Sequence, residues 1–133
     1  MRRISALLAG LLAAAAAQAA SLQDFELNKQ LKDIARQSSV GTPRAINEDI
    51  LDQGYSVEGN QLINHLGVRA SHAAEMRRNP DAVRQQLRAS VCRNPGYRQL
   101  LGKGAVLSYS FSEHKSNRPV TTERFQASDC GLK

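Results

Sequence analysis

The two cysteines, Cys92 and Cys130, are the residues of this sequence with the most specific chemistry. A catalytic cysteine needs a thiolate with a base held against it, and a structural zinc site needs cysteines and histidines at ligand spacing. The sequence has no such spacing. Its beginning predicts export to an oxidising compartment, where cysteines pair. We therefore predict a Cys92–Cys130 disulfide, no metal site and no cofactor.

Histidines and serines offer a second kind of chemistry, that of a hydrolase. His65, His114 and Ser110 are the candidates, because acyl transfer requires a nucleophile in contact with a base. The segment Ser112–Lys115 has the S-x-x-K spacing of penicillin-binding enzymes, but it falls at a predicted strand end instead of a helix start. We predict a non-enzymatic protein that acts by binding a partner. A small secreted hydrolase is the alternative.

Arginines form the third candidate group. Arg77, Arg84 and Arg88 lie along one face if the predicted helix continues through Pro80. An ordinary solvated face is the competing interpretation, since Asp81 is spaced to form local salt bridges with this stripe. We expect that any binding to an anionic partner depends on Arg77, Arg84 and Arg88. Replacing all three with Gln should then leave the fold intact.

The charge is unevenly distributed along the chain. Residues 20–60 carry four basic and seven acidic side chains, whereas residues 61–133 carry twelve basic and five acidic ones. Such asymmetry concerns partners and solubility. The expected partner is an unknown protein or an anionic component of the envelope or host. Nucleic acid is not expected, because export removes the usual target and no aromatic platform is interleaved with the arginines.

The N-terminus has the three parts of a secretory signal. Residues 1–3 are basic, residues 4–17 are uncharged and mostly apolar, and Ala17-Gln18-Ala19 is a cleavage site of small residues. The apolar run is shorter than the roughly 20 residues that a transmembrane helix needs. We predict a cleaved signal peptide over 1–19 and a secreted or periplasmic domain over 20–133 with no transmembrane segment. Loss of Arg2 and Arg3 lowers the formal charge from +6 to +4.

Hydrophobic periodicity predicts the elements that position these residues. Helical spacing and breakers predict helices over 22–37, 71–76, 80–92 and 94–102. Alternation on either side of the turn at 58–60 predicts a hairpin with Leu51, Tyr55 and Val57 on one strand and Leu62, Leu66 and Val68 on the other.

The segment "AVLSYSFS" (105–112) predicts the most regular strand. Leu107, Tyr109 and Phe111 should face helices, and Ser108, Ser110 and Ser112 should face water. The last strand, 119–127, has an irregular pattern that predicts a bulge or an edge position. We predict a single α+β domain of order α-β-β-α-α-β-β, with helices packed on one face of a four-stranded antiparallel sheet.

Four segments together resemble a known family: "TPRAINEDILDQGYSVEGNQL", "RNPDAVRQQLRASVC", "GYRQLLGKGAVLSYSF" and "RFQASDC". The sequence resembles the quorum-sensing-regulated virulence factors, small secreted proteins of Pseudomonas, over about residues 21–130. The resemblance implies a secreted α+β domain, expression linked to quorum sensing and a role in virulence. It supplies no catalytic residue.

Overall fold

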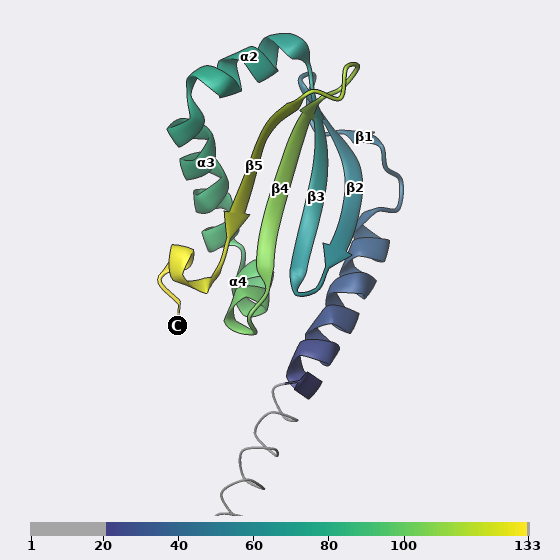
Figure 1. Cartoon of the computed structure of the whole chain (residues 1–133), viewed down its shortest axis with the longest axis vertical. Helices are drawn as coiled ribbons and strands as arrows, with labels where there is room; N and C mark the ends of the chain where they lie inside the picture. The colour runs from purple at the N-terminus through teal and green to yellow at the C-terminus, as the bar shows by residue number, and fades with distance from the viewer. Residues whose placement is uncertain (1–20, 133) are drawn as a thin grey trace, which may run out of the picture.

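A computed structural model describes residues 21–132 and shows one sheet with helices packed against it (Figure 1). The predicted signal peptide, 1–19, lies outside the described residues. An N-terminal helix covers residues 21–38. The elements after it are, in chain order, β1 (Arg44–Ala45), β2 (Ile50–Glu58), β3 (Gln61–Val68), α2 (Ala70–Arg78), α3 (Pro80–Arg93), α4 (Pro95–Gly102), β4 (Val106–Glu113), β5 (Pro119–Phe125) and the 3-10 helix η1 (Ala127–Cys130).

The sheet has five strands in the order β1-β2-β3-β4-β5, and it is mixed. β3 and β4 are parallel, and the other neighbouring pairs are antiparallel. The prediction of four antiparallel strands in the order α-β-β-α-α-β-β was therefore wrong. Alternation reports which face of a strand is covered and not the strand's direction. Residues 69–105 form three helices that return the chain to the start of β3, so β4 begins beside it, with Gln61 opposite Val106.

The predicted register of β4 is confirmed. Leu107 and Phe111 are buried in the core, and Tyr109 packs against it from the same face. The serines point to the opposite face, but Ser108 does not face water, because only 3% of its surface is exposed. Arg124, the register partner of Ser108 on β5, donates from Nε to Gln61 Oε1 of β3 at 3.0 Å, so a hydrogen bond joins the strands on either side of β4.

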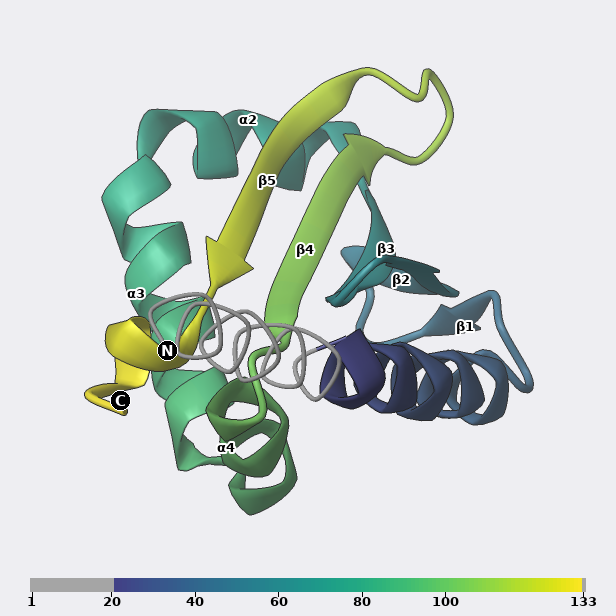
Figure 2. The same cartoon turned by 60° about the horizontal axis from the view of Figure 1, so that its bottom comes forward.

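The core forms between one face of the sheet and the helices. Leu27 and Leu31 of the N-terminal helix pack in one cluster with Leu62 of β3, Val91 of α3 and Phe125 of β5. A smaller cluster joins α2 to β3 and β4, and Leu87 and Tyr109 pack against both clusters. Figure 2 shows the N-terminal helix and α4 on the same side of the sheet. Helices on one face of an α+β sheet are therefore confirmed.

β5 is an edge strand with a register shift against β4, as its irregular pattern predicted. The opposite edge is also irregular, because β1 pairs only with Leu51 and Asp52 of β2. Beyond that pair, β2 bulges at Gly54, and the Ser39 hydroxyl takes the place of a strand partner. It accepts from Tyr55 N at 2.9 Å and donates to Tyr55 O at 3.4 Å.

Candidate functional site

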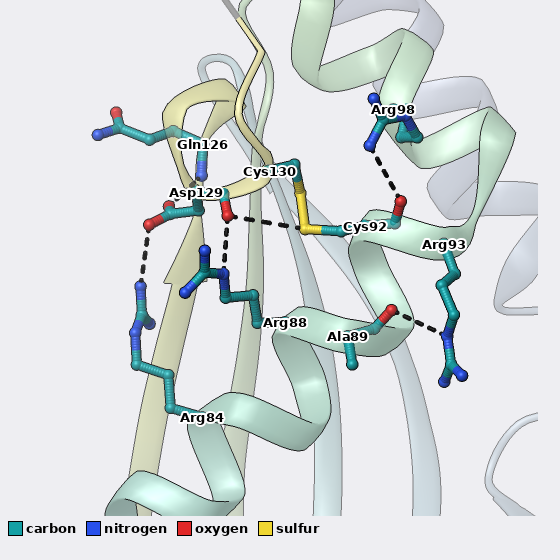
Figure 3. The surroundings of a disulfide bond; sticks show 9 residues. All are labelled: Arg84, Arg88, Ala89, Cys92, Arg93, Arg98, Gln126, Asp129 and Cys130. Atoms are coloured by element: carbon teal, nitrogen blue, oxygen red, sulfur yellow. Dashed lines mark hydrogen bonds and ion pairs between the residues drawn. A yellow bond between two sulfur atoms is a disulfide. The ribbon is translucent and has the colours of Figure 1, made fainter.

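The structure contains the predicted disulfide between Cys92 and Cys130 (Figure 3). Cys92 lies in the last turn of α3, and Cys130 ends η1, 38 residues later. The bond joins the helical layer to the segment that follows β5. Within residues 21–132 no cysteine is free, which is typical of proteins from oxidising compartments.

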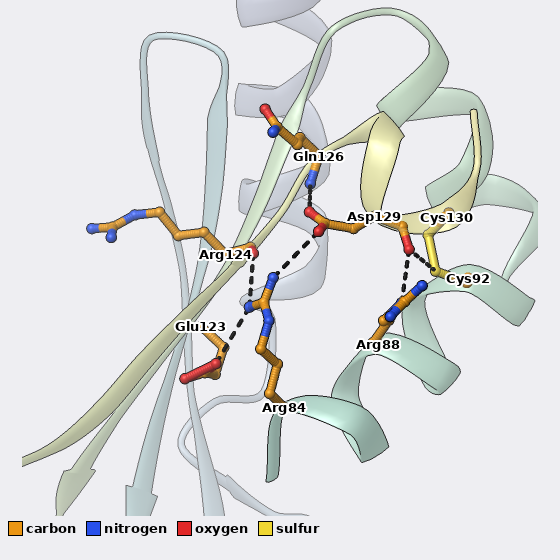
Figure 4. Close-up of polar contacts among 8 residues, drawn as sticks. All are labelled: Arg84, Arg88, Cys92, Glu123, Arg124, Gln126, Asp129 and Cys130. Carbon is orange, nitrogen blue, oxygen red and sulfur yellow. Dashed lines mark hydrogen bonds and ion pairs between the residues drawn. A yellow bond between two sulfur atoms is a disulfide. The ribbon is translucent and has the colours of Figure 1, made fainter. Parts of the chain in front are cut away.

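The three arginines of the predicted stripe all face β5 and η1. Arg77 Nη2 lies 2.8 Å from Glu113 Oε2 and donates to Pro119 O at 2.9 Å. Arg84 donates to the carboxylates of Glu123 and Asp129, at 3.3 and 3.4 Å, and to Arg124 O at 3.2 Å (Figure 4). Arg88 Nε donates to Asp129 O at 2.8 Å. The guanidinium of Arg84 also lies 4.6 Å from the ring centroid of Phe125.

The three arginines face the sheet edge because of contacts with the strands and η1, which the sequence did not indicate. The helix does not continue through Pro80, because α2 ends at Arg78 and the backbone angles of Asn79 are not helical. Arg77 and Arg84 pair with strand residues, and neither pairs with Asp81. Their bonds within the protein attach α2 and α3 to the outer edge of the sheet. Binding of an anionic partner by Arg77, Arg84 and Arg88 stays a prediction.

The predicted hydrolase residues lie on the helix-free face of the sheet. Ser110 is the register partner of His65, and His65 Nε2 lies 2.6 Å from the hydroxyl of Ser56. His114 lies beside Gly67, where an added Cβ would be 3.5 Å from its Nδ1. Among residues 21–132, no carboxylate is bonded to His65 that could orient its ring, and the Ser56–His65 contact is exposed. A serine–histidine contact alone does not provide the oriented base and oxyanion donors of acyl transfer.

Two tyrosines lie between the helices and the sheet. Burial, with a smaller contribution from Tyr97, raises the pKa of Tyr55 to about 12. Burial also raises the pKa of Tyr109 far above its ordinary value. Both side chains pack against the main hydrophobic cluster. They therefore stabilise the core as neutral phenols.

An exposed apolar pair lies on the N-terminal helix. Leu22 and Phe25 are 63% and 68% exposed, although both side chains are large and apolar. A cleft of about 500 Å³ lies between a neighbouring face of this helix and α4. It is lined by Gln23, Glu26, Leu27, Gln30, Gly102 and Lys103. Sequence reasoning missed this pair. The sequence contained one indication of it: Leu22 and Phe25 do not share the helical spacing that places Leu27 and Leu31 on the buried face.

Two further properties concern the described residues, 21–132. No helix in this range is both long and apolar enough to cross a membrane. In the same range, no group of three or more His, Cys, Asp or Glu side chains is placed to hold a metal ion.

Comparison with known proteins identifies the family. Residues 20–131 match the family described as "Putative quorum-sensing-regulated virulence factor". The chain belongs to this family. A crystal structure of a "putative secreted protein" from Pseudomonas aeruginosa is 72% identical in sequence, with a TM-score of 0.80 over 82% of this chain and 96% of that one. A search of curated proteins finds no match.

Two pilotins share the fold of this family member at low sequence identity. The type 2 secretion system pilotin EpsS of Vibrio vulnificus is 12% identical, with a TM-score of 0.73 over 85% of this chain and 99% of that one. The type II secretion system pilotin AspS of Vibrio cholerae is 14% identical, with a TM-score of 0.67 over 83% and 97%.

Proposed function

We propose that this protein is a non-enzymatic exported protein that acts by binding another protein. We further propose that the partner docks on the face of the N-terminal helix that carries Leu22 and Phe25. The exposure of these two apolar side chains carries this proposal. Large apolar side chains that gather on a surface mark interaction sites, because burying them against a partner removes their area from water.

The polar residues beside this face of the helix suit a protein partner. Glu26 and Lys103 provide one charge of each sign, and Lys103 Nζ donates to Gln30 Oε1 at 3.2 Å. An apolar centre with polar groups at its rim is the usual anatomy of a protein–protein interface. The fold shared with pilotins supports the same class of function, since those proteins are pilotins of type II secretion systems. We propose that the role in virulence is exerted through this binding.

Photo-crosslinking in cells that make the protein tests the proposal. A benzophenone amino acid at position 25 should yield a discrete adduct with one partner protein. The same amino acid at Arg78, which is exposed on α2 away from the cleft, should not. Substitution of Leu22 by Asp should abolish the adduct formed from position 25. Absence of an adduct at position 25, or equal adducts from both positions, contradicts the proposal.

A separate experiment tests the hydrolase alternative, which the Ser56–His65 contact favours. We expect no labelling of the protein by a fluorophosphonate probe, which modifies activated serines. Labelling that Ser56→Ala or Ser110→Ala abolishes would establish the hydrolase instead.

A further inference from the structure

Positive charge on α2, α3 and α4 exceeds what the local carboxylates neutralise. This segment carries six arginines and only two acidic side chains, Glu75 and Asp81. Arg77 and Arg84 pair with carboxylates from the strands and η1. Arg78, Arg88, Arg93 and Arg98 form no ion pair with any residue in the described range 21–132.

Three of these arginines are held in place by main-chain carbonyls. Arg88 Nε donates to Asp129 O at 2.8 Å, Arg93 Nε to Ala89 O at 3.1 Å, and Arg98 Nη1 to Cys92 O at 3.1 Å. A carbonyl oxygen fixes a guanidinium without cancelling its net charge. The carbonyls at the end of α3 favour cations because they are the negative end of the helix dipole. The arginines are therefore positioned but still fully cationic.

The hydrogen bonds of Arg88 and Arg93 leave one two-donor edge of each guanidinium available to a carboxylate. Because Arg88 and Arg93 use Nε internally, the Nη1 and Nη2 groups of both side chains have no partner among residues 21–132. This paired edge binds a carboxylate through two parallel hydrogen bonds. Arg84 differs, since its Nη1 and Nη2 both donate within the protein.

The arginines surround the end of α3 and the disulfide. Arg88 and Arg93 lie on different sides of the helix in Figure 3, as five residues at 3.6 per turn place side chains about 140° apart. A cleft of about 500 Å³ adjoins Arg88, and the disulfide and Ala89 contribute to its wall. A flat bilayer cannot contact both sides of a helix end, whereas an extended chain can pass around it.

We propose that Arg88, Arg93 and Arg98 bind an extended acidic peptide segment. Carboxylates of the segment pair with the three guanidiniums as it passes around the end of α3, and one of its side chains enters the cleft beside the disulfide. The inference rests on the proposed function in that the segment belongs to a partner protein. It uses a different surface from the one at Leu22 and Phe25, so each proposal can fail without the other.

Binding of a fluorescein-labelled decaglutamate peptide tests this surface by fluorescence anisotropy. The parent protein should bind at low salt and more weakly at physiological salt, where charges are screened over about 8 Å. The combined variant Arg88→Gln, Arg93→Gln and Arg98→Gln should bind roughly tenfold more weakly, as expected for the loss of two exposed pairs and one half-buried pair. The matched control Lys29→Gln, Lys32→Gln and Arg78→Gln removes the same net charge elsewhere and should bind like the parent.

Nuclear magnetic resonance of the parent protein provides a readout that needs no variant. Decaglutamate should shift the Nε–H signals of Arg88, Arg93 and Arg98 and leave that of Arg84 in place. Equal weakening by the control variant, no binding at low salt, or unshifted signals would overturn the proposal. So would binding of phosphatidylglycerol vesicles but not of the peptide, because that would assign the surface to a membrane.

Discussion

Arginines in this protein differ by the groups they bond to. Arg77 and Arg84 each combine a carboxylate with an outward-facing carbonyl of β5, at Pro119 and Arg124. Edge strands expose carbonyl groups that other chains can pair with. Arg77 and Arg84 donate hydrogen bonds to such carbonyls and thereby attach the helices to the sheet edge. We assign them to stability, which changes the expectation that Gln at these positions leaves the fold unaffected.

We expect Arg84→Gln to lower the free energy of unfolding by about 1–3 kcal/mol, because it removes charge-assisted hydrogen bonds to partly buried Glu123 and Asp129. Urea denaturation measures the loss. Arg78→Gln is the control, since Arg78 is exposed and forms no ion pair in the described chain; its effect should lie within about 0.5 kcal/mol. Equal midpoints for the two variants would contradict the assignment.

The buried tyrosines predict a loss of stability in alkali. The pKa of Tyr55 is about 12 in the folded state against 10 for a free side chain, and that of Tyr109 is also raised. A raised phenol pKa means that the folded state keeps its proton where the unfolded state loses it. The stabilisation is therefore complete below pH 10 and decreases as the pH rises toward the folded pKa.

Thermal melting from pH 8 to pH 12, with tyrosinate absorbance recorded in parallel, checks this expectation. The melting temperature should fall above pH 10, and Tyr55→Phe should make that fall shallower. A melting temperature that declines equally in the variant would show that other groups cause it.

At the scale of elements, the bulge of β2 depends on one glycine and a buried polar pair. Gly54 has a φ of +104°, and its N–H donates to Asp52 Oδ1 at 2.9 Å. Asn64 Nδ2 donates to the same oxygen at 3.1 Å. Both polar side chains are buried on the helix-facing side of the sheet, where their mutual bonds offset the loss of water. The bulge thus keeps Asp52 and Tyr55 in register with β3.

Gly54→Ala should destabilise the protein by about 1–3 kcal/mol, because the backbone conformation is one that other residues rarely adopt. The new Cβ would also lie 3.2 Å from Thr42 Oγ1. Gly102→Ala in α4 is the control, since its φ is not in the positive range and a Cβ there meets no atom within 4 Å. Chemical denaturation should separate the two variants. A neutral Gly54→Ala would mean that the bulge relaxes at no cost.

Elements with many periodic residues were predictable, and those defined by tertiary contacts were not. The register of β4 follows from its alternation, because one face of the strand is apolar. β1 could not be predicted, because a strand of two residues has no periodic pattern. Arg44 and Ala45 form a strand only through their pairing with β2. The parallel direction of β4 depends on how three helices pack. The disulfide followed from composition, but the exposure of Phe25 required knowing which helix face is covered.

At the scale of the whole molecule, the disulfide joins the end of α3 to the segment that follows β5. Replacing Cys92 and Cys130 with Ser should lower the free energy of unfolding by about 4 kcal/mol, the chain-entropy value for a loop of 38 residues. The loss should appear in urea denaturation and in faster proteolysis of the C-terminal segment. Thiol labelling of the unfolded, unreduced parent should find no free cysteine. Two free thiols, or unchanged stability of the variant, would contradict this role.

The parallel pairing of β3 with β4 also governs the order in which the protein can fold. β2 and β3 are joined by a tight turn, so they can pair as soon as that turn closes. The central pair must instead close a loop that contains three helices, and the entropy of closure is lost before any contact between the two strands repays it. Leu62, Leu66 and Val68 therefore stay uncovered until the helices dock. We therefore expect the pairing of β3 with β4 to form late in folding. Until it forms, part of the apolar face of the sheet is open to any protein that binds unfolded chains.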